Sequence, residues 1–254
     1  MTQPLKGKTA LITGASRGIG AATATTLAGA GANRIILHYN SYREGAESTA
    51  ERLRSQGIEV TLLSADLSKM EGIRSLIQQL RTGAPKVDIL INNAGHLVHR
   101  AKLLEMNEEV YDSVMTLNTK SVWFVTQAVV PHMIEQGSGV IVNVSSIAAR
   151  NGGGSGATIY AAAKAAVSTM TKGLAKELAP QGIRVNAVSP GTVDNYFHEK
   201  HSTPEMLKNM LAQAPAGRLG TNEEVADTIL FLCSDASRYI YGQTIEINGG
   251  MYMV

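Results

Sequence analysis

Residues 13–20 read TGASRGIG, and this glycine-rich stretch closes a short apolar run that begins at residue 9. An alanine-rich helix is predicted to follow, over residues 18–30. Glycines at such a turn let the backbone pass close to a pyrophosphate, and the helix N-terminus presents free N–H groups and a positive dipole end to it. Three glycines alone are a weak signal. Their place between the first strand and the first helix of a βαβ unit indicates a dinucleotide-binding site and a Rossmann-type fold.

Short β-branched runs alternate with helical segments along the rest of the chain. Continuous apolar strands separated by helices indicate a parallel sheet with helices on both faces. Because no linker, repeat or compositional break interrupts the 254 residues, we expect one Rossmann-type doubly wound α/β domain over residues 1–254, with about seven strands. The predicted strands are residues 9–13, 34–39, 59–63, 87–91, 139–144, 184–188 and 243–247. The other long helices are predicted at residues 43–56, 110–136 (two helices or one interrupted), 160–178 and 223–234.

The composition argues against several classes of protein. The formal net charge is +2 and the Lys and Arg residues are scattered, so neither nucleic acid nor an anionic membrane is an expected partner. The single cysteine, Cys233, has no partner for an intrachain disulfide and is interpreted as a small buried side chain. The N-terminus lacks the layout of a signal peptide, and no stretch approaches the ~18 apolar residues of a membrane span. We therefore expect a cytoplasmic protein.

The end of the second predicted strand indicates which dinucleotide is bound. An NAD site usually has Asp or Glu there to bind the ribose hydroxyls, whereas residues 38–43 read HYNSYR, without a carboxylate. A 2′-phosphate would meet no repulsion and could bind Arg17, Asn40 and Ser41, and Arg43 is a further candidate. These residues predict NADP(H), and the alternative is that both arginines are solvated surface residues.

Two later strand ends are expected at the same site. Asp66 follows the third strand and is expected either to accept a hydrogen bond from the adenine amino group or to cap a helix. Residues 92–95 read NNAG, and such small residues let the backbone lie against a cofactor, with a plain turn as the alternative. The dinucleotide-binding residues predicted from these segments are Gly14, Ser16, Arg17, Gly18, Ile19, Gly20, Asn40, Ser41, Asp66, Leu67, Asn93, Ala94 and Gly95.

Tyr160 and Lys164 are spaced i, i+4, which places a phenol and an ammonium on one face of a predicted helix. Upstream, Ser145 and Ser146 follow the end of a strand, and Asn118 lies in an earlier helix. Carbonyl reduction needs a proton donor, a partner that lowers its pKa, and a hydrogen bond that polarises the carbonyl. A nearby ammonium favours the phenolate of a tyrosine, whose unperturbed pKa is ~10. The set therefore predicts interconversion of a ketone and a secondary alcohol.

These motifs together resemble the short-chain dehydrogenase/reductase family over essentially the whole chain, closest in pattern to its 3-oxoacyl-reductase-like members. The resemblance implies direct hydride transfer between nicotinamide and substrate, with no metal. It also implies a homo-oligomer, a tetramer or a dimer, in which helices around Asn118 and Tyr160 pair between copies. The matching positions are Thr13, Gly14, Gly18, Gly20, residues 92–95, Asn118, Ser146, Tyr160, Lys164, Pro190, Gly191, Gly242 and Gln243.

The resemblance implies a role for each matching residue. Tyr160 is expected to be the general acid in reduction and the base in oxidation, while Ser146 holds the substrate oxygen. Lys164 is expected to bind the nicotinamide ribose and to lower the tyrosine pKa. Asn118 is expected to anchor a water that relays protons. The nicotinamide is expected to be lined by Pro190, Gly191 and Val193.

The sequence departs from the family pattern in two places. Asn195 stands near the expected phosphates, where the family often has threonine. A glycine-rich loop at residues 150–156 lengthens the separation of Ser146 from Tyr160, so Ser145 is the alternative if the register slips.

Substrate contacts are expected from two loops and a lid. The loops are residues 96–100 and 150–159, and the lid is residues 192–213. Four histidines lie in the first loop and the lid without metal-ligand spacing, and they are interpreted as loop or surface residues. They are His96, His99, His198 and His201.

A small carbonyl or alcohol is the expected substrate. An acidic carrier protein is not favoured, because residues 132–138 read HMIEQGS and offer no Lys or Arg to steer it. Two alternatives remain, an NAD-dependent alcohol or polyol dehydrogenase and a non-catalytic dinucleotide-binding redox sensor. The sensor is less favoured because the chain keeps the whole set of Asn118, Ser146, Tyr160 and Lys164.

Overall fold

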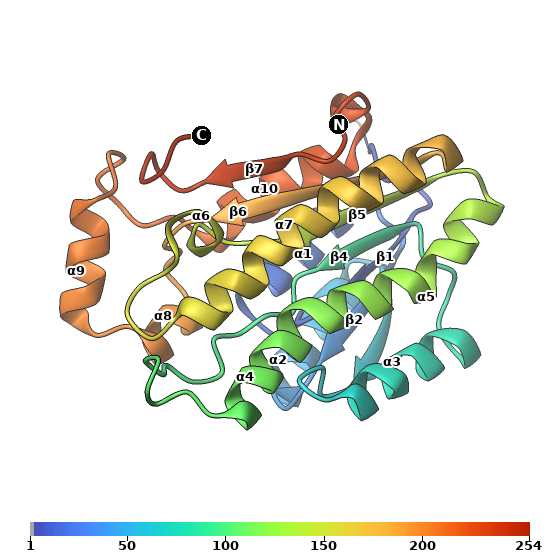
Figure 1. Ribbon diagram of the computed structural model, residues 1–254. Helices are drawn as coiled ribbons and strands as arrows, with labels where there is room; N and C mark the ends of the chain where they lie inside the picture. The colour runs from blue at the N-terminus through green and yellow to red at the C-terminus, as the bar shows by residue number, and fades with distance from the viewer. Residues whose placement is uncertain (1–2) are drawn as a thin grey trace.

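The computed structural model describes residues 3–254, and at its centre lies a seven-stranded sheet in the order β3-β2-β1-β4-β5-β6-β7 (Figure 1). Every strand is parallel to its neighbours. The predicted Rossmann-type fold is therefore confirmed. The strands are β1 (Thr9–Ile12), β2 (Arg34–Tyr39), β3 (Glu59–Ser64), β4 (Ile89–Asn92), β5 (Gly139–Val144), β6 (Ile183–Pro190) and β7 (Thr244–Ile247).

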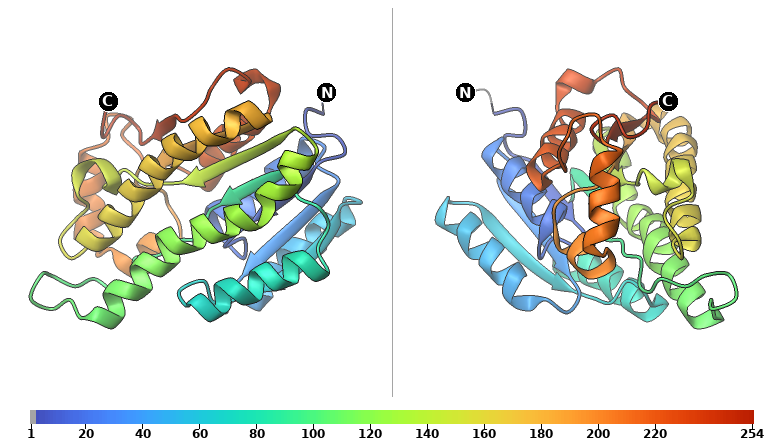
Figure 2. Two further views of the ribbon diagram at one scale, coloured as in Figure 1. Left: turned by 45° about the vertical axis from the view of Figure 1, so that its right-hand side comes forward. Right: turned by 90° about the vertical axis from the view of Figure 1, so that its left-hand side faces the viewer.

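Helices cover both faces of the sheet, as Figure 2 shows in two further views. One face packs on α1 (Gly18–Gly29), α2 (Arg43–Ser55) and α10 (Asn222–Cys233), whose buried side chains join one apolar cluster. The other face packs on α3 (Met70–Thr82), α5 (Ser121–Glu135) and α7 (Thr158–Leu178), which join a second cluster. The strands supply side chains to both clusters alternately, because successive residues of a strand point to opposite faces. In β1, for example, Ile12 joins the first cluster and Leu11 the second.

The strand order reverses between β1 and β4, and this point determines where a ligand can bind. The chain leaves β1 toward β2 and β3 on one side, and it returns to place β4 and the later strands on the other. The loops that follow β1 and β4 therefore diverge and leave a crevice at the carboxyl ends of the strands. In open parallel sheets, ligands bind in this crevice.

The helical segment predicted at residues 110–136 is interrupted, as one of the two readings allowed. α4 (Glu108–Met115) runs into one turn of π-helix at Thr116–Lys120, and α5 continues from Ser121. Such turns are rare and occur frequently at functional sites. The π turn contains Asn118.

The lid contains two short helices, α8 (Tyr196–His201) and α9 (Pro204–Ala212), beyond the carboxyl ends of the strands (Figure 1). A further short helix, α6 (Ala148–Asn151), follows β5. Two 3-10 turns, Ala179–Gln181 and Asp235–Ser237, complete the connections. Within residues 3–254, none of the helices has the length and apolar character that crossing a membrane requires.

Candidate active site

A cavity of about 940 Å³ runs along the carboxyl ends of the strands, from the glycine-rich loop to the lid. It brings together nearly all the residues predicted for the cofactor and for catalysis. Gly20 and Asn118 are the two exceptions, because both lie behind the lining. The cavity therefore joins the predicted dinucleotide site to the predicted catalytic set.

The glycine-rich loop after β1 packs so closely that side chains cannot be added to it. Gly14 has a φ of +66°, and a Cβ there would lie 2.9 Å from the Cα of Ala94. A Cβ on Gly20 would lie 2.3 Å from the carbonyl oxygen of Gly14. Thr13 joins the loop to residues 92–95, since its Oγ1 accepts hydrogen bonds from the N–H groups of Asn93 and Ala94, each at 3.0 Å. Backbone lines this part of the cavity as a pyrophosphate site requires.

The N-terminus of α1 lies at the cavity and carries no acidic residue in its first turn. Its free N–H groups and dipole favour an anion there. Asn195, which stands where the family often has threonine, also lies near the N-terminus of α1. Its Nδ2 donates to Asn222 Oδ1 at 3.0 Å, and its Oδ1 accepts from the N–H of Phe197, which caps α8.

Arg17 stands beside this helix end, between two tyrosine rings. Its guanidinium carbon lies 4.0 Å from the ring centroids of both Tyr42 and Tyr196. Stacking of this kind holds a guanidinium by its faces and leaves the N–H groups at its edge for an anion. Arg43 is placed differently, because its Nε donates to Glu47 Oε1 at 2.7 Å and it does not line the cavity. Arg43 is thus removed from the candidate 2′-phosphate ligands, while Asn40 and Ser41 line the cavity as expected.

His38 is a buried member of the site that sequence reasoning missed. Its Nδ1 accepts a hydrogen bond from the N–H of Gly14 at 3.2 Å, so its Nε2 carries the proton that is donated to the carbonyl oxygen of Ala65 at 3.0 Å. Burial lowers the pKa of His38 to about 4, so the ring is neutral at physiological pH. The imidazole thus joins the ends of three strands behind the glycine-rich loop. The available signal was a polar residue within an otherwise apolar strand.

Asp66 lines the cavity, but it does not cap a helix. The N-cap position of α3 is Lys69. Asp66 Oδ1 instead accepts from the N–H of Ser68 at 3.0 Å and from its hydroxyl at 2.7 Å, and Asn40 Nδ2 approaches it at 3.4 Å. The capping alternative is wrong in this form, because the carboxylate closes a local turn before the helix begins.

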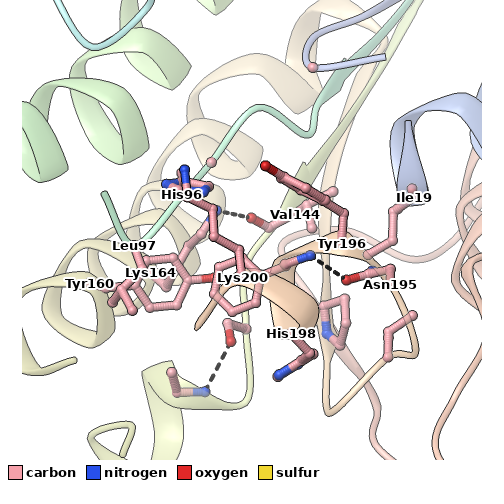
Figure 3. A pocket seen from close by; sticks show the side chains of 18 of the residues that line it. Ile19, His96, Leu97, Val144, Tyr160, Lys164, Asn195, Tyr196, His198 and Lys200 are labelled. Atoms are coloured by element: carbon pink, nitrogen blue, oxygen red, sulfur yellow. Dashed lines mark hydrogen bonds between the residues drawn. The ribbon is translucent and has the colours of Figure 1, made fainter. Parts of the chain in front are cut away.

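Tyr160 and Lys164 lie side by side on α7, as their spacing predicted (Figure 3). Ser146 lines the same cavity and is close enough to Tyr160 to influence the pKa of its phenol. Lys164 is 3% exposed, lies 5.8 Å from the centroid of the tyrosine ring and donates from Nζ to the carbonyl oxygen of Val144 at 2.8 Å. Gly95 makes room for this ammonium, because a Cβ there would lie 2.6 Å from Nζ.

The pKa of Tyr160 differs from the expected direction. Burial raises it to about 12, and the neighbouring Ser146 hydroxyl opposes that rise. Burial also lowers the pKa of Lys164 to about 8. The expectation of a lowered tyrosine pKa is therefore not met by these side chains alone, because desolvation of the phenolate outweighs the opposing effect of Ser146.

The two serines have different hydrogen-bond partners. Ser145 is buried, and its hydroxyl bonds to the carbonyl oxygen of Lys164 at 2.9 Å and to Ser168 Oγ at 2.8 Å. Ser146 lines the cavity, and its Oγ accepts from the N–H of Ala148 at 3.1 Å. Ser145 therefore fastens the end of β5 to α7, whereas the Ser146 hydroxyl is the one that acts on the pKa of Tyr160.

Asn118 supports the loop at residues 96–100 from below. Its Nδ2 donates to the carbonyl oxygens of His96 at 2.9 Å and Val114 at 2.8 Å, while its Oδ1 accepts from the N–H of His96 at 3.1 Å. The side chain is fully buried. Its expected role in anchoring a water stays a prediction.

The three expected substrate segments meet above Tyr160. His96 from the first loop and His201 from the lid approach with their Nε2 atoms 2.9 Å apart. Phe197 lies between them and Tyr160, with its ring centroid 5.9 Å from that of Tyr160 and 5.2 Å from that of His201. Arg100 joins all three segments, since it donates to the carbonyl oxygens of His201 and Ser155, each at 2.8 Å.

The reading of the histidines as loop or surface residues needs correction. His99 is exposed, but His96, His198 and His201 are partly buried against the lid. Burial lowers the pKa of His96 and of His198 to about 4. Among residues 3–254, no cluster of three His, Cys, Asp or Glu is arranged to hold a metal ion.

The end of β6 closes the cavity on the remaining side. Pro190, Gly191 and Val193 line it. A Cβ on Gly191 would lie 2.7 Å from the Cβ of Asn248, so the backbone there approaches the loop after β7 closely. This placement agrees with the predicted nicotinamide wall.

Comparison with known proteins places the chain among oxidoreductases. The family model described as enoyl-(acyl carrier protein) reductase matches residues 14–252. The 3-oxoacyl-(acyl-carrier-protein) reductase FabG of Thermotoga maritima is 42% identical over 248 residues, covering 97% of this chain and 98% of the relative. The corresponding protein of Staphylococcus aureus is 39% identical over 246 residues, covering 97% and 98%.

Solved structures agree with this placement. A protein from Beutenbergia cavernae, described as an NAD(P)-dependent gluconate 5-dehydrogenase with bound NADP at low occupancy, superposes with a TM-score of 0.90 and 33% identity over 99% of both chains. A protein from Agrobacterium tumefaciens described as a gluconate dehydrogenase superposes with a TM-score of 0.91 and 31% identity, over 100% of this chain and 99% of the other.

Proposed function

The chain belongs to the short-chain dehydrogenase/reductase family, and from this membership we propose that it is an NADP(H)-dependent oxidoreductase that interconverts a ketone and a secondary alcohol. The observation that carries the proposal is the placement of Ser146, Tyr160 and Lys164 together in a cavity that continues to the glycine-rich loop, with Lys164 Nζ 5.8 Å from the centroid of the Tyr160 ring. A polarising hydroxyl, a proton donor and a cation are the groups that carbonyl reduction requires.

The residues at the other end of the cavity fit a phosphorylated dinucleotide. At Gly14 and Gly20 the backbone packs so closely that a Cβ would collide with neighbouring backbone atoms. The N-terminus of α1 faces the cavity, and its first turn has no acidic residue. Arg17, Asn40 and Ser41 would hold the 2′-phosphate, because no carboxylate among residues 38–43 repels it. The NADP in the Beutenbergia cavernae structure supports the same choice.

The protein's own residues supply the proton and orient the carbonyl. Bound NADPH supplies the hydride in reduction, and NADP⁺ accepts it in oxidation. Ser146 would donate a hydrogen bond to the substrate oxygen, which strengthens as negative charge develops on that oxygen. Tyr160 would then give its hydroxyl proton to the same oxygen, and in oxidation the phenolate would take it back.

The pKa values of the pair suit this division of work. A phenol whose pKa is about 12 keeps its proton at neutral pH and is ready to act as an acid. Lys164, with a pKa of about 8, is predominantly charged at neutral pH and stabilises the phenolate left after the proton has gone. The phenol is therefore in its proton-donating form at neutral pH, and the phenolate that oxidation requires becomes more populated as the pH rises.

A coenzyme titration followed by a turnover assay tests the proposal. NADPH should bind at least about tenfold more tightly than NADH, measured by nicotinamide fluorescence, and some ketone should then be reduced. Tyr160→Phe should bind NADPH normally and lower turnover about a thousandfold. Equal or tighter binding of NADH would favour the NAD-dependent alcohol dehydrogenase instead, and normal turnover by Tyr160→Phe would remove the tyrosine mechanism.

We also propose that the chain forms a homo-oligomer through α4 and α5. Tyr111 on α4 and Trp123 on α5 are each 42% exposed. Large aromatic side chains exposed on neighbouring helices are typical of protein–protein contacts. Sedimentation of the purified protein should give a dimer or tetramer, and Trp123→Lys should shift it toward a smaller species. A wild-type monomer at all concentrations would contradict this.

A further inference from the structure

The charged residues around the cavity are almost all basic. Four cationic side chains line it, and Asp66 is the single carboxylate among the lining residues. The whole protein is nearly neutral, with a formal net charge of +2, so the imbalance is local. The cationic residues are Arg17, Arg100, Lys164 and Lys200.

These charges divide between two ends of the cavity. Arg17 and Asp66 lie at the dinucleotide end, and Lys164 lies beside the catalytic tyrosine. Arg100 and Lys200 lie at the other end, where the lid meets the two substrate loops. This end has no carboxylate in its lining. No lining carboxylate therefore pairs with its positive charge.

Arg100 is held rigidly and carries no counter-charge. Its Nε donates to the carbonyl oxygen of His201 and its Nη1 to that of Ser155, each at 2.8 Å. No carboxylate of residues 3–254 lies within salt-bridge distance of it. A guanidinium has five N–H donors, so these two bonds fix the side chain and leave donors for a further acceptor. Partial burial strengthens the electrostatic attraction between such a donor and an anion.

Other arginines of the protein show what an occupied guanidinium looks like. Arg150 donates from Nε to a carboxylate oxygen of Glu246 at 2.8 Å. Arg218 donates two hydrogen bonds to the carboxylate of Glu224. The buried Arg184 gives both terminal nitrogens to oxygens of Leu232, Ser234 and Ser237. Arg100 differs from both kinds, because Nη2 has no partner among the described residues and it faces a cavity rather than the core.

We propose that the substrate is a ketone, or the matching secondary alcohol, that also carries a carboxylate, and that Arg100 binds this carboxylate at the lid end of the cavity. The proposal rests on the proposed function, since it names the substrate class of that site. The planar fork of a guanidinium matches a carboxylate through two parallel hydrogen bonds. Lys200, exposed on the lid, adds long-range attraction.

A carboxylate is favoured over a phosphate by the number of fixed donors. A phosphate dianion is usually bound by several cations or by a helix N-terminus, and Arg100 is the single fixed cation at this end. Lys200 is on a flexible exposed stem. One guanidinium balances one carboxylate charge.

The bound carboxylate takes no part in the bond changes. A hydride adds to the carbonyl carbon, the C=O π bond breaks toward oxygen, and that oxygen takes the proton of Tyr160. The products are the hydroxy acid and NADP⁺, and a solvent proton restores Tyr160. Arg100 is therefore a binding residue, and its loss should appear in KM more than in kcat.

Matched pairs of acid and ester test the proposal. The probes are 4-oxopentanoate, 5-oxohexanoate and 6-oxoheptanoate, each beside its methyl ester, which keeps the ketone and removes the charge. With NADPH, at least one acid should show kcat/KM about tenfold or more above its ester. Titration calorimetry of the same compounds into the protein with NADP⁺, which has no hydride to give, should show the same preference as tighter binding.

Substitution assigns the preference to Arg100. Arg100→Met should lower the acid-to-ester ratio to near one, mainly through the KM of the acid, and Arg100→Lys should keep an intermediate ratio. Arg81→Met is the matched control, because Arg81 is exposed on α3 away from the cavity. NADPH binding by Arg100→Met confirms that the variant is folded.

The outcomes separate this inference from the proposed function. Reduction of esters as fast as acids, with equal binding, overturns the carboxylate and leaves the reductase intact. A preference for a ketone phosphate such as dihydroxyacetone phosphate, lost in Arg100→Met, also overturns it. If no ketone is reduced but the acids still bind the NADP⁺ complex through Arg100, the proposed function fails and the anion site stands.

Discussion

His96 and His201 face each other with their Nε2 atoms 2.9 Å apart, although 105 positions separate them in the chain. The N–H of Val98 donates to His96 Nδ1 at 2.9 Å, so the His96 proton resides on Nε2 and His201 accepts it. The pair therefore requires both rings to be neutral. It joins the first substrate loop to the lid directly above Tyr160.

Acidification should open the lid through this pair. Burial, then the charges of His201 and Lys200, lower the pKa of His96 to about 4 from 6.5, and burial lowers that of His201. The closed lid thus binds fewer protons than an open one. The contribution of this pair to the free energy of the closed lid is therefore fully present above pH 6.5 and is lost as the pH falls toward 4.

Hydrogen exchange of residues 196–212 at pH 7.5 and pH 5, corrected for intrinsic rates, should reveal a loss of protection of roughly tenfold, discounted for the partial exposure of His96. His201→Asn should weaken this pH dependence, part of which remains because burial also lowers the pKa of His198 on the lid, whereas His99→Asn, at an exposed position, should leave it unchanged. Equal protection at both pH values would contradict the prediction that the neutral histidine pair holds the lid closed.

The two serines should separate catalysis from stability. Ser146→Ala removes the hydroxyl that acts on the pKa of Tyr160 and should lower kcat about a hundredfold with little change in Tm. Ser145→Ala removes a buried bond to α7 and should lower the free energy of unfolding by about 1 kcal/mol while kcat changes much less. Chemical denaturation and steady-state kinetics measure both, and a reversed pattern would show that the register is wrong.

Two glycines of α1 should respond in opposite ways to the same substitution. Gly20→Ala places a Cβ 2.3 Å from the oxygen of Gly14 and 2.6 Å from Asn93 Nδ2, so it should cost about 1–3 kcal/mol and weaken NADPH binding at least tenfold. Gly29→Ala meets nothing within 4 Å and should raise the free energy of unfolding by up to about 1 kcal/mol. Thermal unfolding with and without NADPH distinguishes the two variants. Tight NADPH binding by Gly20→Ala would contradict the assignment of the glycine-rich loop as the pyrophosphate site.

Arg17 should control the choice between coenzymes. Arg17→Gln should weaken NADPH binding about a hundredfold and NADH binding far less, because only NADPH presents a 2′-phosphate to it. Arg43→Gln is the control, since Arg43 pairs with Glu47 outside the cavity. Equal losses of affinity for the two coenzymes in Arg17→Gln would show that Arg17 supports the lid and does not bind the 2′-phosphate.

Sequence reasoning predicted the sheet well because buried parallel strands are continuous apolar runs. Each predicted strand is present, and the differences lie at the ends. β4, for example, begins at Ile89 rather than residue 87, and β6 extends to Pro190. Local hydrogen bonding decides such ends, and hydrophobic pattern carries little information about it.

The site was predictable where its chemistry depends on local spacing. Tyr160 and Lys164 share a helix, so their spacing alone placed them together. The contacts of His96 with His201 and of Arg100 with Ser155 join loops that are distant in the chain. Residue patterns within a loop do not encode such contacts, so the sequence does not show which of the loop and lid histidines are buried. The upward pKa shift of Tyr160 was missed for a related reason, because desolvation depends on the packed surroundings.

The lid is supported at both ends of the cavity, by Tyr196 on Arg17 and by His201 on His96. Coenzyme and substrate therefore act on one shared element. Any coenzyme that changes how Tyr196 rests on Arg17 changes the free energy of closing the lid over the substrate. By thermodynamic reciprocity, a substrate that tightens the lid must change the affinity for coenzyme by the same factor. A single short segment thus makes the two binding equilibria interdependent across the length of the cleft.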